Sequence, residues 1–156
     1  MRAIETTRFG TVRFEEREVI EFPAGLPGFE EVHEFLLIEA EESVPLKFLQ
    51  SVQQPSLSFV CAPMNLVVSS YEGVLARADR DLLAMPTDGA AQGTILEWLA
   101  ILCFSRPDAP TANLLGPLVL RRDVGLGVQS IREDMRYSAR QLLFDAEANV
   151  GQPVCL

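Results

Sequence analysis

Prolines and glycines divide the apolar residues of this chain into short runs, and this feature restricts the fold most. The 156 residues include 10 prolines and 10 glycines. Many of the runs between them alternate apolar with polar side chains, which is typical of antiparallel β-strands. We expect strands at 3–8, 11–15, 19–22, 34–39, 46–52, 57–61, 66–69, 71–78, 94–104, 112–121 and 124–130.

This pattern predicts a mainly β fold, a small antiparallel β-barrel-like single domain with one or two short helices. So many short strands in one small domain must protect their edges, and closing the sheet does so. The first two strands predict a two-stranded meander. The most apolar segment, 94–104, is expected to be a central strand beside 112–121, in which Gly116 and Pro117 form a bulge.

The other segments are expected to be less regular. A short helix at 79–85 would have Asp79 as its N-cap and end before Pro86. Residues 88–93 are expected to form a flexible loop, and 132–144 are amphipathic at best. The domain is expected to span 1–145, followed by a flexible C-terminal tail at 146–156.

Acidic residues are concentrated at the start of the chain. The first 45 residues hold eleven of the 22 carboxylates against four arginines, a net charge of −7 in a chain at −9. Binding phosphates requires a concentrated basic surface, so we expect no direct nucleic-acid partner. The acidic residues are either solvated surface or a contact for a basic partner, and the contact candidates are Glu39, Glu41 and Glu42.

Nothing in the sequence predicts export or membrane insertion. Residues 1–10 lack an apolar signal region, and the apolar run 95–104 is interrupted by Glu97 and is too short to span a bilayer. Cys61 and Cys103 lie in apolar runs, Cys155 lies near the end, and no CxxC occurs. We therefore expect a cytoplasmic protein with buried, reduced thiols and no membrane partner.

Catalytic, metal and cofactor motifs are missing. His33 is the single histidine, so the Glu-x-x-His at 30–33 cannot form a di-iron site, which needs two copies. No Gly-x-Ser-x-Gly presents a serine nucleophile, and no Walker motif occurs. Gly125 and Gly127 begin a dinucleotide-like pattern, but Ser130 replaces its last glycine, so a twisted strand is favoured. We expect no enzymatic activity, no metal and no cofactor.

A few polar residues have both a structural and a binding interpretation. Gln50 and Gln53, near the end of a predicted strand, either close a turn, which is favoured, or hold a partner's backbone. Asn113 either closes the loop 106–110 or faces a ligand.

Basic and aromatic residues pose similar alternatives near the C-terminus and in the Pro/Gly stretch 22–29. Arg132, Arg136 and Arg140 recur four residues apart around Tyr137 and close to acidic residues, so they either pair within the chain, which is favoured, or form a basic strip for an acidic partner. Arg136, Tyr137 and Arg140 are candidate partner-binding residues. The apolar side chains Phe22, Leu26 and Phe29 of the stretch 22–29 either pack inside the fold, which is favoured, or form an exposed apolar anchor.

Several motifs occur in a recognisable order. They are RFGTV at 8–12, IEFPAGLPGFE at 20–30, FLQSV at 48–52, TANL at 111–114 with GPL at 116–118, and MRYSAR at 135–140. Together, from about residue 4 to residue 144, they closely resemble the flagellar assembly factor FliW family.

The resemblance implies a small β-barrel-like protein that is not an enzyme and is a monomer when free. FliW-like proteins bind newly made flagellin in the cytoplasm, and alternatively the RNA-binding translational regulator CsrA. When free flagellin is scarce, FliW antagonises CsrA allosterically and flagellin translation resumes. A chain at −9 is consistent with a basic, RNA-binding partner.

The sequence departs from the family pattern at several positions. Leu115 stands where relatives often carry a polar residue, Arg121 where an asparagine is usual, and Ser138 and Gln141 where the tail often has other polar residues. If the asparagine position contacts CsrA, the arginine favours flagellin or a diverged regulator. The alternative function is a small-molecule-binding or enzymatic β-barrel with an interior pocket.

Overall fold

The computed structural model describes residues 1–86 and 93–143. Its strands are β1 (Arg2–Thr6), β2 (Gly10–Phe14), β3 (Ile20–Glu21), β4 (Glu34–Ile38), β5 (Lys47–Ser51), β6 (Ser58–Pro63), β7 (Glu97–Cys103), β8 (Thr111–Arg121), β9 (Leu126–Gln129) and β10 (Gln141–Leu142). Two short helices, α1 (Met64–Val67) and α2 (Arg77–Leu82), and two single 3₁₀ turns, η1 (Glu16–Glu18) and η2 (Glu41–Ser43), complete the described elements.

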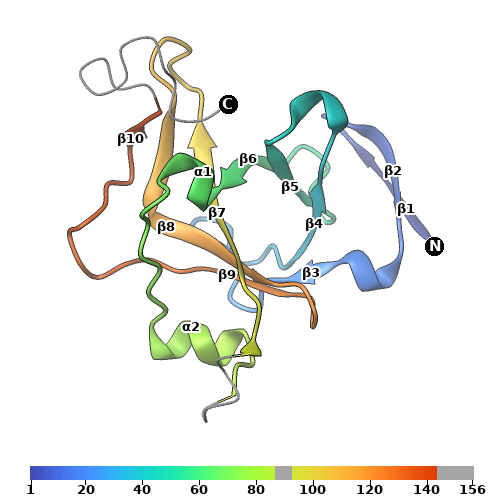
Figure 1. Ribbon diagram of the computed structural model, residues 1–156. Coiled ribbons are helices and arrows are strands. Elements are labelled where there is room, and N and C mark those ends of the chain that lie inside the picture. Colours follow the sequence, from blue (N-terminus) through green and yellow to red (C-terminus); the bar gives the residue numbers. More distant parts are fainter. Residues whose placement is uncertain (87–92, 144–156) are drawn as a thin grey trace.

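Seven of the strands close into a barrel. They follow the order β8-β7-β6-β5-β4-β3-β9, and β9 pairs back to β8. The pairing of β3 with β9 is parallel, whereas the other neighbours are antiparallel. β10 extends the sheet beside β8, and β1 and β2 form a separate two-stranded sheet (Figure 1). The predicted mainly β, barrel-like fold and the N-terminal meander are both confirmed.

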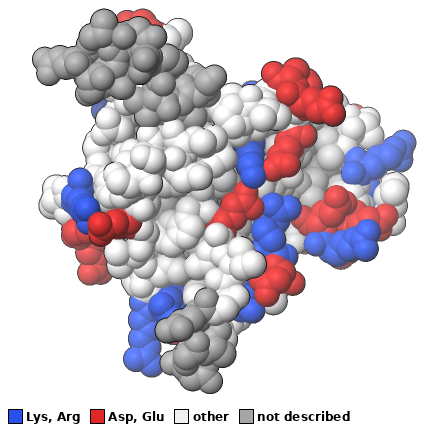
Figure 2. Space-filling model, viewed as in Figure 1, with Lys and Arg blue, Asp and Glu red and all other residues white. Residues whose placement is uncertain are grey.

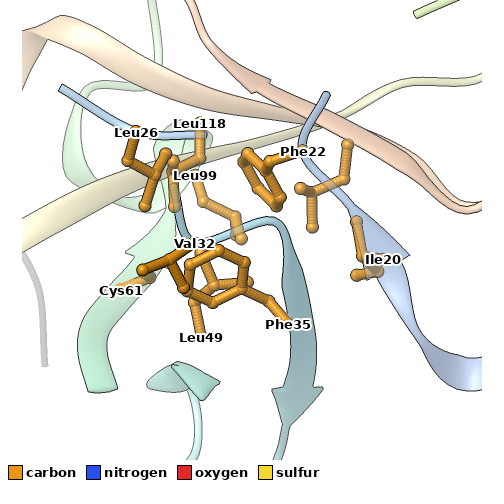
Figure 3. Packing of buried hydrophobic residues seen from close by; sticks show 10 residues of the cluster. Ile20, Phe22, Leu26, Val32, Phe35, Leu49, Cys61, Leu99 and Leu118 are labelled. Carbon is orange, nitrogen blue, oxygen red and sulfur yellow. The ribbon is translucent and has the colours of Figure 1, made fainter. Parts of the chain in front are cut away.

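Apolar side chains from the barrel strands and from the stretch 22–29 fill the inside of the barrel. Phe22, Phe35, Leu49 and Leu99 are each fully buried, and they point toward one another in Figure 3. The rings of Phe22 and Phe35 meet edge to face with centroids 5.2 Å apart. Burial of each such side chain contributes about 1.5–3 kcal/mol to folding.

The stretch 22–29 lies in the connection between β3 and β4 and packs inward. Phe22 and Leu26 are buried, and Phe29 packs against the same core, so the predicted packing is confirmed. Gly25 has φ +65°, and a Cβ there would lie 2.6 Å from the carbonyl oxygen of Phe29. Only glycine fits such a position without strain.

The strand prediction for β7 and β8 is also confirmed. β7 lies between β6 and β8, and β8 contains the bulge that Gly116 and Pro117 predict. Leu99 is opposite Leu118 but Ile101 is opposite Asn113, so β8 has extra residues between those two pairs. Gly127 in β9 lies against the ring of Phe22, where a Cβ would be 2.6 Å from the ring.

Two predicted strands are wrong. Residues 66–69 do not form a strand, because Met64–Val67 is α1, which buries Met64 and Val67 three residues apart on one face. Residues 71–78 contain no strand either. Their first part is irregular and packs through Tyr71 against Trp98 and Tyr137, and their end belongs to α2.

The predicted helix at 79–85 exists but begins earlier. α2 starts at Arg77 with Ala76 as its N-cap, so Asp79 lies in the first turn, where its carboxylate accepts a hydrogen bond from the hydroxyl of Ser130 at 2.7 Å. Cys61 is buried as expected, but Cys103 is exposed, which corrects the prediction of a buried thiol. Residues 88–92 of the predicted loop, the tail 146–156 and Cys155 lie outside the described residues.

Candidate functional site

A charged network lies at one end of the barrel, at the ends of β4, β5 and β7, on the same strand faces as the core residues Leu37, Leu49 and Leu99. The ammonium group of Lys47 lies 2.8 Å from a carboxylate oxygen of Glu39 and 2.8 Å from one of Glu97. The second oxygen of Glu97 pairs with Arg122 at 3.2 Å. We call these four residues the Lys47 network.

The pKa values in this network reflect its partial burial. Burial disfavours the charge of Lys47, but hydrogen bonds to Glu39 and Glu97 outweigh it and raise the pKa of the ammonium group. The hydrogen bond and charge of Lys47 lower the pKa of Glu39. Lys47 and Glu39 therefore stay charged at neutral pH.

The acidic residues predicted to contact a partner lie beside this network. Glu41 and Glu42 are exposed on the turn η2, which Ala40 separates from Glu39. Within the described residues neither is in an ion pair. With Glu39 and Glu97, they give this surface four carboxylates against Lys47 and Arg122. We call Glu39, Glu41 and Glu42 the acidic turn. In Figure 2, acidic and basic side chains lie side by side on the half of the molecule that carries β4 and β5.

A second cluster is built by Tyr71 and by the C-terminal segment, which we define as residues 130–143. The rings of Tyr71 and Tyr137 have centroids 4.5 Å apart. The guanidinium of Arg132 lies 5.3 Å from the first centroid and 4.8 Å from the second. It also donates to the carbonyl of Glu72 and makes two 2.8 Å hydrogen bonds to Asp134. We call this group the tyrosine–arginine cluster.

Arg136 has an outer position in the same cluster. Its guanidinium lies 5.5 Å from the ring centroid of Tyr137 and 2.7 Å from a carboxylate oxygen of Glu72. The hydrogen bond between the two raises the pKa of Arg136 and lowers that of Glu72. In the same way Arg132 lowers the pKa of Asp134. The favoured interpretation, pairing within the chain, is thus confirmed for Arg132 and Arg136.

Backbone hydrogen bonds hold the C-terminal segment along β8. Ser130 donates to Pro117, Arg132 donates to Leu115, and Leu114 donates to Ser138, each at 2.8–2.9 Å. Leu115 and Ser138, which depart from the family pattern, therefore lie where the C-terminal segment meets β8. Their backbone carbonyls accept two of these hydrogen bonds. Arg140 is exposed at its far end, before β10.

The remaining candidates make hydrogen bonds within the chain. Gln50 is fully buried, and its amide donates to the carbonyls of Ser51 and Pro55. The side-chain oxygen of Gln53 accepts from the backbone N–H of His33 at 2.6 Å. The side-chain oxygen of Asn113 accepts from Leu115 and Gly116 and so closes the bulge. These contacts agree with the structural interpretations, although Asn113 closes the bulge rather than the preceding loop.

Arg121, where relatives often have asparagine, also acts inside the fold. Its side chain is 14% exposed and forms an ion pair with Asp123 at 3.1 Å. It donates to the carbonyls of Leu83 and Ala84, where α2 ends and carbonyls lack helical partners. The arginine therefore caps α2.

Sequence reasoning missed Lys47, Glu97 and Tyr71, and it named Arg132 only as one of the arginines that could pair within the chain. Two features of the sequence could have indicated Lys47 and Glu97. Lys47 is the single lysine and follows an acidic segment, and Glu97 is the one charge in a strongly apolar strand. Tyr71 and Arg132 meet only through the tertiary fold, so no local pattern marks them.

Two kinds of feature are absent from the described part of the chain. Residues 1–86 and 93–143 contain no group of three or more histidine, cysteine, aspartate or glutamate side chains placed to hold a metal. In the same ranges, no helix has the length and apolar character needed to cross a membrane.

These observations define a class: a small closed β-barrel protein with a filled interior and charged clusters at its surface. A family model described as FliW protein matches residues 3–143. The flagellar assembly factor FliW of Leptospira interrogans is 32% identical over 145 residues, covering 93% of this chain and 95% of the relative. That of Desulfitobacterium hafniense is 33% identical over 154 residues, 96% of each chain.

A solved structure agrees with these relatives. The crystal structure of the flagellar assembly factor FliW matches with a TM-score of 0.83 and 28% identity, covering 94% of this chain and 100% of that chain. The chain belongs to the FliW family, as the order of its motifs predicts.

Proposed function

We propose that this protein is a non-enzymatic, cytoplasmic flagellar assembly factor with two alternative protein partners, flagellin and the translational regulator CsrA. Binding of CsrA relieves its repression of flagellin translation, and abundant flagellin displaces the regulator. The observation that supports this most is the family match over residues 3–143, together with relatives that are named flagellar assembly factors.

The state of the barrel interior favours this proposal over a small-molecule-binding or enzymatic barrel. Phe22, Phe35, Leu49 and Leu99 occupy the space where an interior ligand would lie. A ligand pocket needs a concave, accessible volume with a few polar groups placed to contact the ligand. Under the alternative, a metabolite library would raise the melting temperature of the protein. Under our proposal, the library leaves it unchanged.

We assign the acidic turn to the regulator. Glu41 and Glu42 are exposed, and Glu39 is more than half exposed despite its pairing with Lys47. An RNA-binding partner carries a basic surface, and an acidic surface attracts it over a range set by salt, about 8 Å at physiological ionic strength. Arg136, Tyr137 and Arg140 remain candidates for contact with either partner.

The first experiment tests the pair of partners. The purified protein is mixed with monomeric flagellin, with CsrA, and with both, and each mixture is separated by size-exclusion chromatography. We expect a stoichiometric complex with each partner and no ternary complex. Absence of both binary complexes would refute the proposed function, and a stable ternary complex would refute the alternation between partners.

The second experiment tests the acidic turn. Replacing Glu39, Glu41 and Glu42 with glutamine should weaken CsrA binding, and more strongly at low salt than at high salt, because salt screens exposed charges. A control with the same loss of charge replaces three exposed carboxylates elsewhere, namely Glu21, Glu31 and Glu133. If both triple variants bind equally well at low salt, the acidic turn serves solubility alone.

A further inference from the structure

A hollow lies at the end of the β7–β8 hairpin that is farthest from the Lys47 network. Its volume is about 530 Å³, within the usual range of ligand sites. Cys103 and Thr111 line it from the two strands, Arg106 from the hairpin loop, and Arg140 and Leu142 from the C-terminal segment. Glu97 and Cys103 are the two ends of β7, so about 20 Å of strand separates this hollow from the network.

The lining of this hollow is cationic. It includes Arg106 and Arg140 but no aspartate or glutamate, whereas the hollow between the stretch 22–29 and α2 contains Glu30 and Asp79. Neither arginine is in an ion pair within the described residues, unlike the two arginines of the tyrosine–arginine cluster. In a chain with net charge −9, a concave site with two such cations attracts an anion.

The thiol of Cys103, the last residue of β7, has surroundings that are consistent with a positively charged site. Cys103 is exposed, and its sulfur lies 3.2 Å from the hydroxyl of Ser105. Hydrogen bonds from Ser105 lower the pKa of the thiol, and the charge of Arg140 lowers it further. The surroundings of Cys103 thus stabilise negative charge.

Apolar side chains lie between the charged ones. Ile101 and Leu142 both line the hollow, and Leu142 is 45% exposed. A free phosphate would use the arginines but not these apolar surfaces. A peptide that combines carboxylates with an aliphatic side chain would use both.

We propose that this hollow binds an acidic segment of a polypeptide partner. Carboxylates of the segment pair with Arg106 and Arg140, and one of its apolar side chains packs on Ile101 and Leu142. This site goes beyond the proposed function, because it is of opposite charge to the acidic turn and lies at the other end of the barrel wall. A single small domain would thus engage a basic surface and an acidic segment at separate places.

Alkylation of Cys103 by uncharged iodoacetamide provides the test. The full chain is used with Cys155→Ser, and Cys61 is fully buried, so the reaction reports on Cys103. The probe is an acetylated and amidated peptide of four glutamates and two leucines, and the control peptide has glutamine in place of each glutamate. We expect the acidic peptide to slow the alkylation several-fold at saturation and the control peptide to have no effect.

Variants separate the arginines from general charge effects. In Arg106→Gln/Arg140→Gln, the concentration needed for half-maximal protection should rise by about tenfold, because two charge-assisted contacts are lost. Arg13→Gln/Arg17→Gln removes two exposed arginines far from the hollow and should leave protection unchanged. Protection is compared within each variant, since the substitutions also change the intrinsic reactivity of the thiol.

Three results would overturn the proposal. One is the absence of protection by the acidic peptide, and another is equal protection by citrate, which would make this a site for small carboxylates. The third is protection only in protein truncated after Leu143, since the chain's own residues 144–156, which include Asp145 and Glu147, would then be the occupant.

Discussion

Arg132 is predicted to hold the C-terminal segment in place, and Arg132→Met tests this. The arginine side chain is 3% exposed, lies over Tyr71 and Tyr137, and donates to the carbonyl of Glu72. Methionine keeps the apolar stem but removes the charge and the donors. The substitution therefore removes interactions without leaving a large cavity.

The expected loss follows from these contacts. A hydrogen bond from a charged donor to the Glu72 carbonyl contributes about 1.5–3 kcal/mol, and each ring contact about 0.5–1 kcal/mol. Because such contributions are not fully additive, we expect the free energy of unfolding to fall by about 3 kcal/mol. For a chain of this size, that lowers the melting temperature by about 6–12 °C.

Urea unfolding monitored by tryptophan fluorescence measures this loss. Trp98 is the single tryptophan, and its ring lies 6.4 Å from that of Tyr71, so its emission reports on this region. The matched control is Arg136→Met, which removes an arginine from the same tyrosine and from an exposed ion pair. We expect a clearly smaller loss for the control. Equal losses in both variants would refute the assignment of the central role to Arg132.

Three other perturbations have expected outcomes. Gly25→Ala should prevent folding or lower the free energy of unfolding by more than about 3 kcal/mol, because its Cβ meets backbone atoms; Gly28→Ala, at positive φ in open space, should cost about 1 kcal/mol in the same urea titration. Ala84 has φ +53° at the end of α2, so Ala84→Gly should raise the melting temperature in calorimetry, with a gain of up to about 1 kcal/mol. Glu39 has a pKa below its usual 4.5, so its pairing stabilises the fold above pH 4.5 and this stabilisation is lost as the pH falls through the lowered pKa. The melting temperature of Glu39→Gln should therefore fall less on acidification than that of the unaltered protein, and parallel curves would contradict this.

Much of the fold could be predicted because strand alternation and turn residues are local signals. The bulge at Gly116 and Pro117 is an example, since a glycine and a proline inside a strand disturb its ladder. The prediction failed where the same apolar composition suits helix and strand. Residues 64–67 form a helix because their two buried side chains are three apart, and 71–76 are irregular because their partners come from the C-terminal segment.

The site was harder to predict than the fold. The density of charged residues can be read from a sequence, but which side chains contact one another cannot. Glu41 and Glu42 are exposed as expected of contact candidates. Gln50, by contrast, is fully buried on the face of β5 opposite to the core residue Leu49, and local composition does not reveal that this face is covered too. Cys103 illustrates the same limit: it follows the buried Leu102 and points to the opposite, open face.

The pairing of β9 with two strands restricts the order in which the barrel can form during synthesis. β9 closes the ring by pairing with β8 on one side and with β3 on the other, so Glu21 meets Leu126 only after most of the chain has been made. Until then, β3 lacks its second neighbour, and Phe22 lacks the close contact that Gly127 provides. Contacts this distant in sequence form slowly. A nascent chain still attached to the ribosome would therefore expose the interior of an open sheet, and the protein would gain its barrel only as its last fifth emerged.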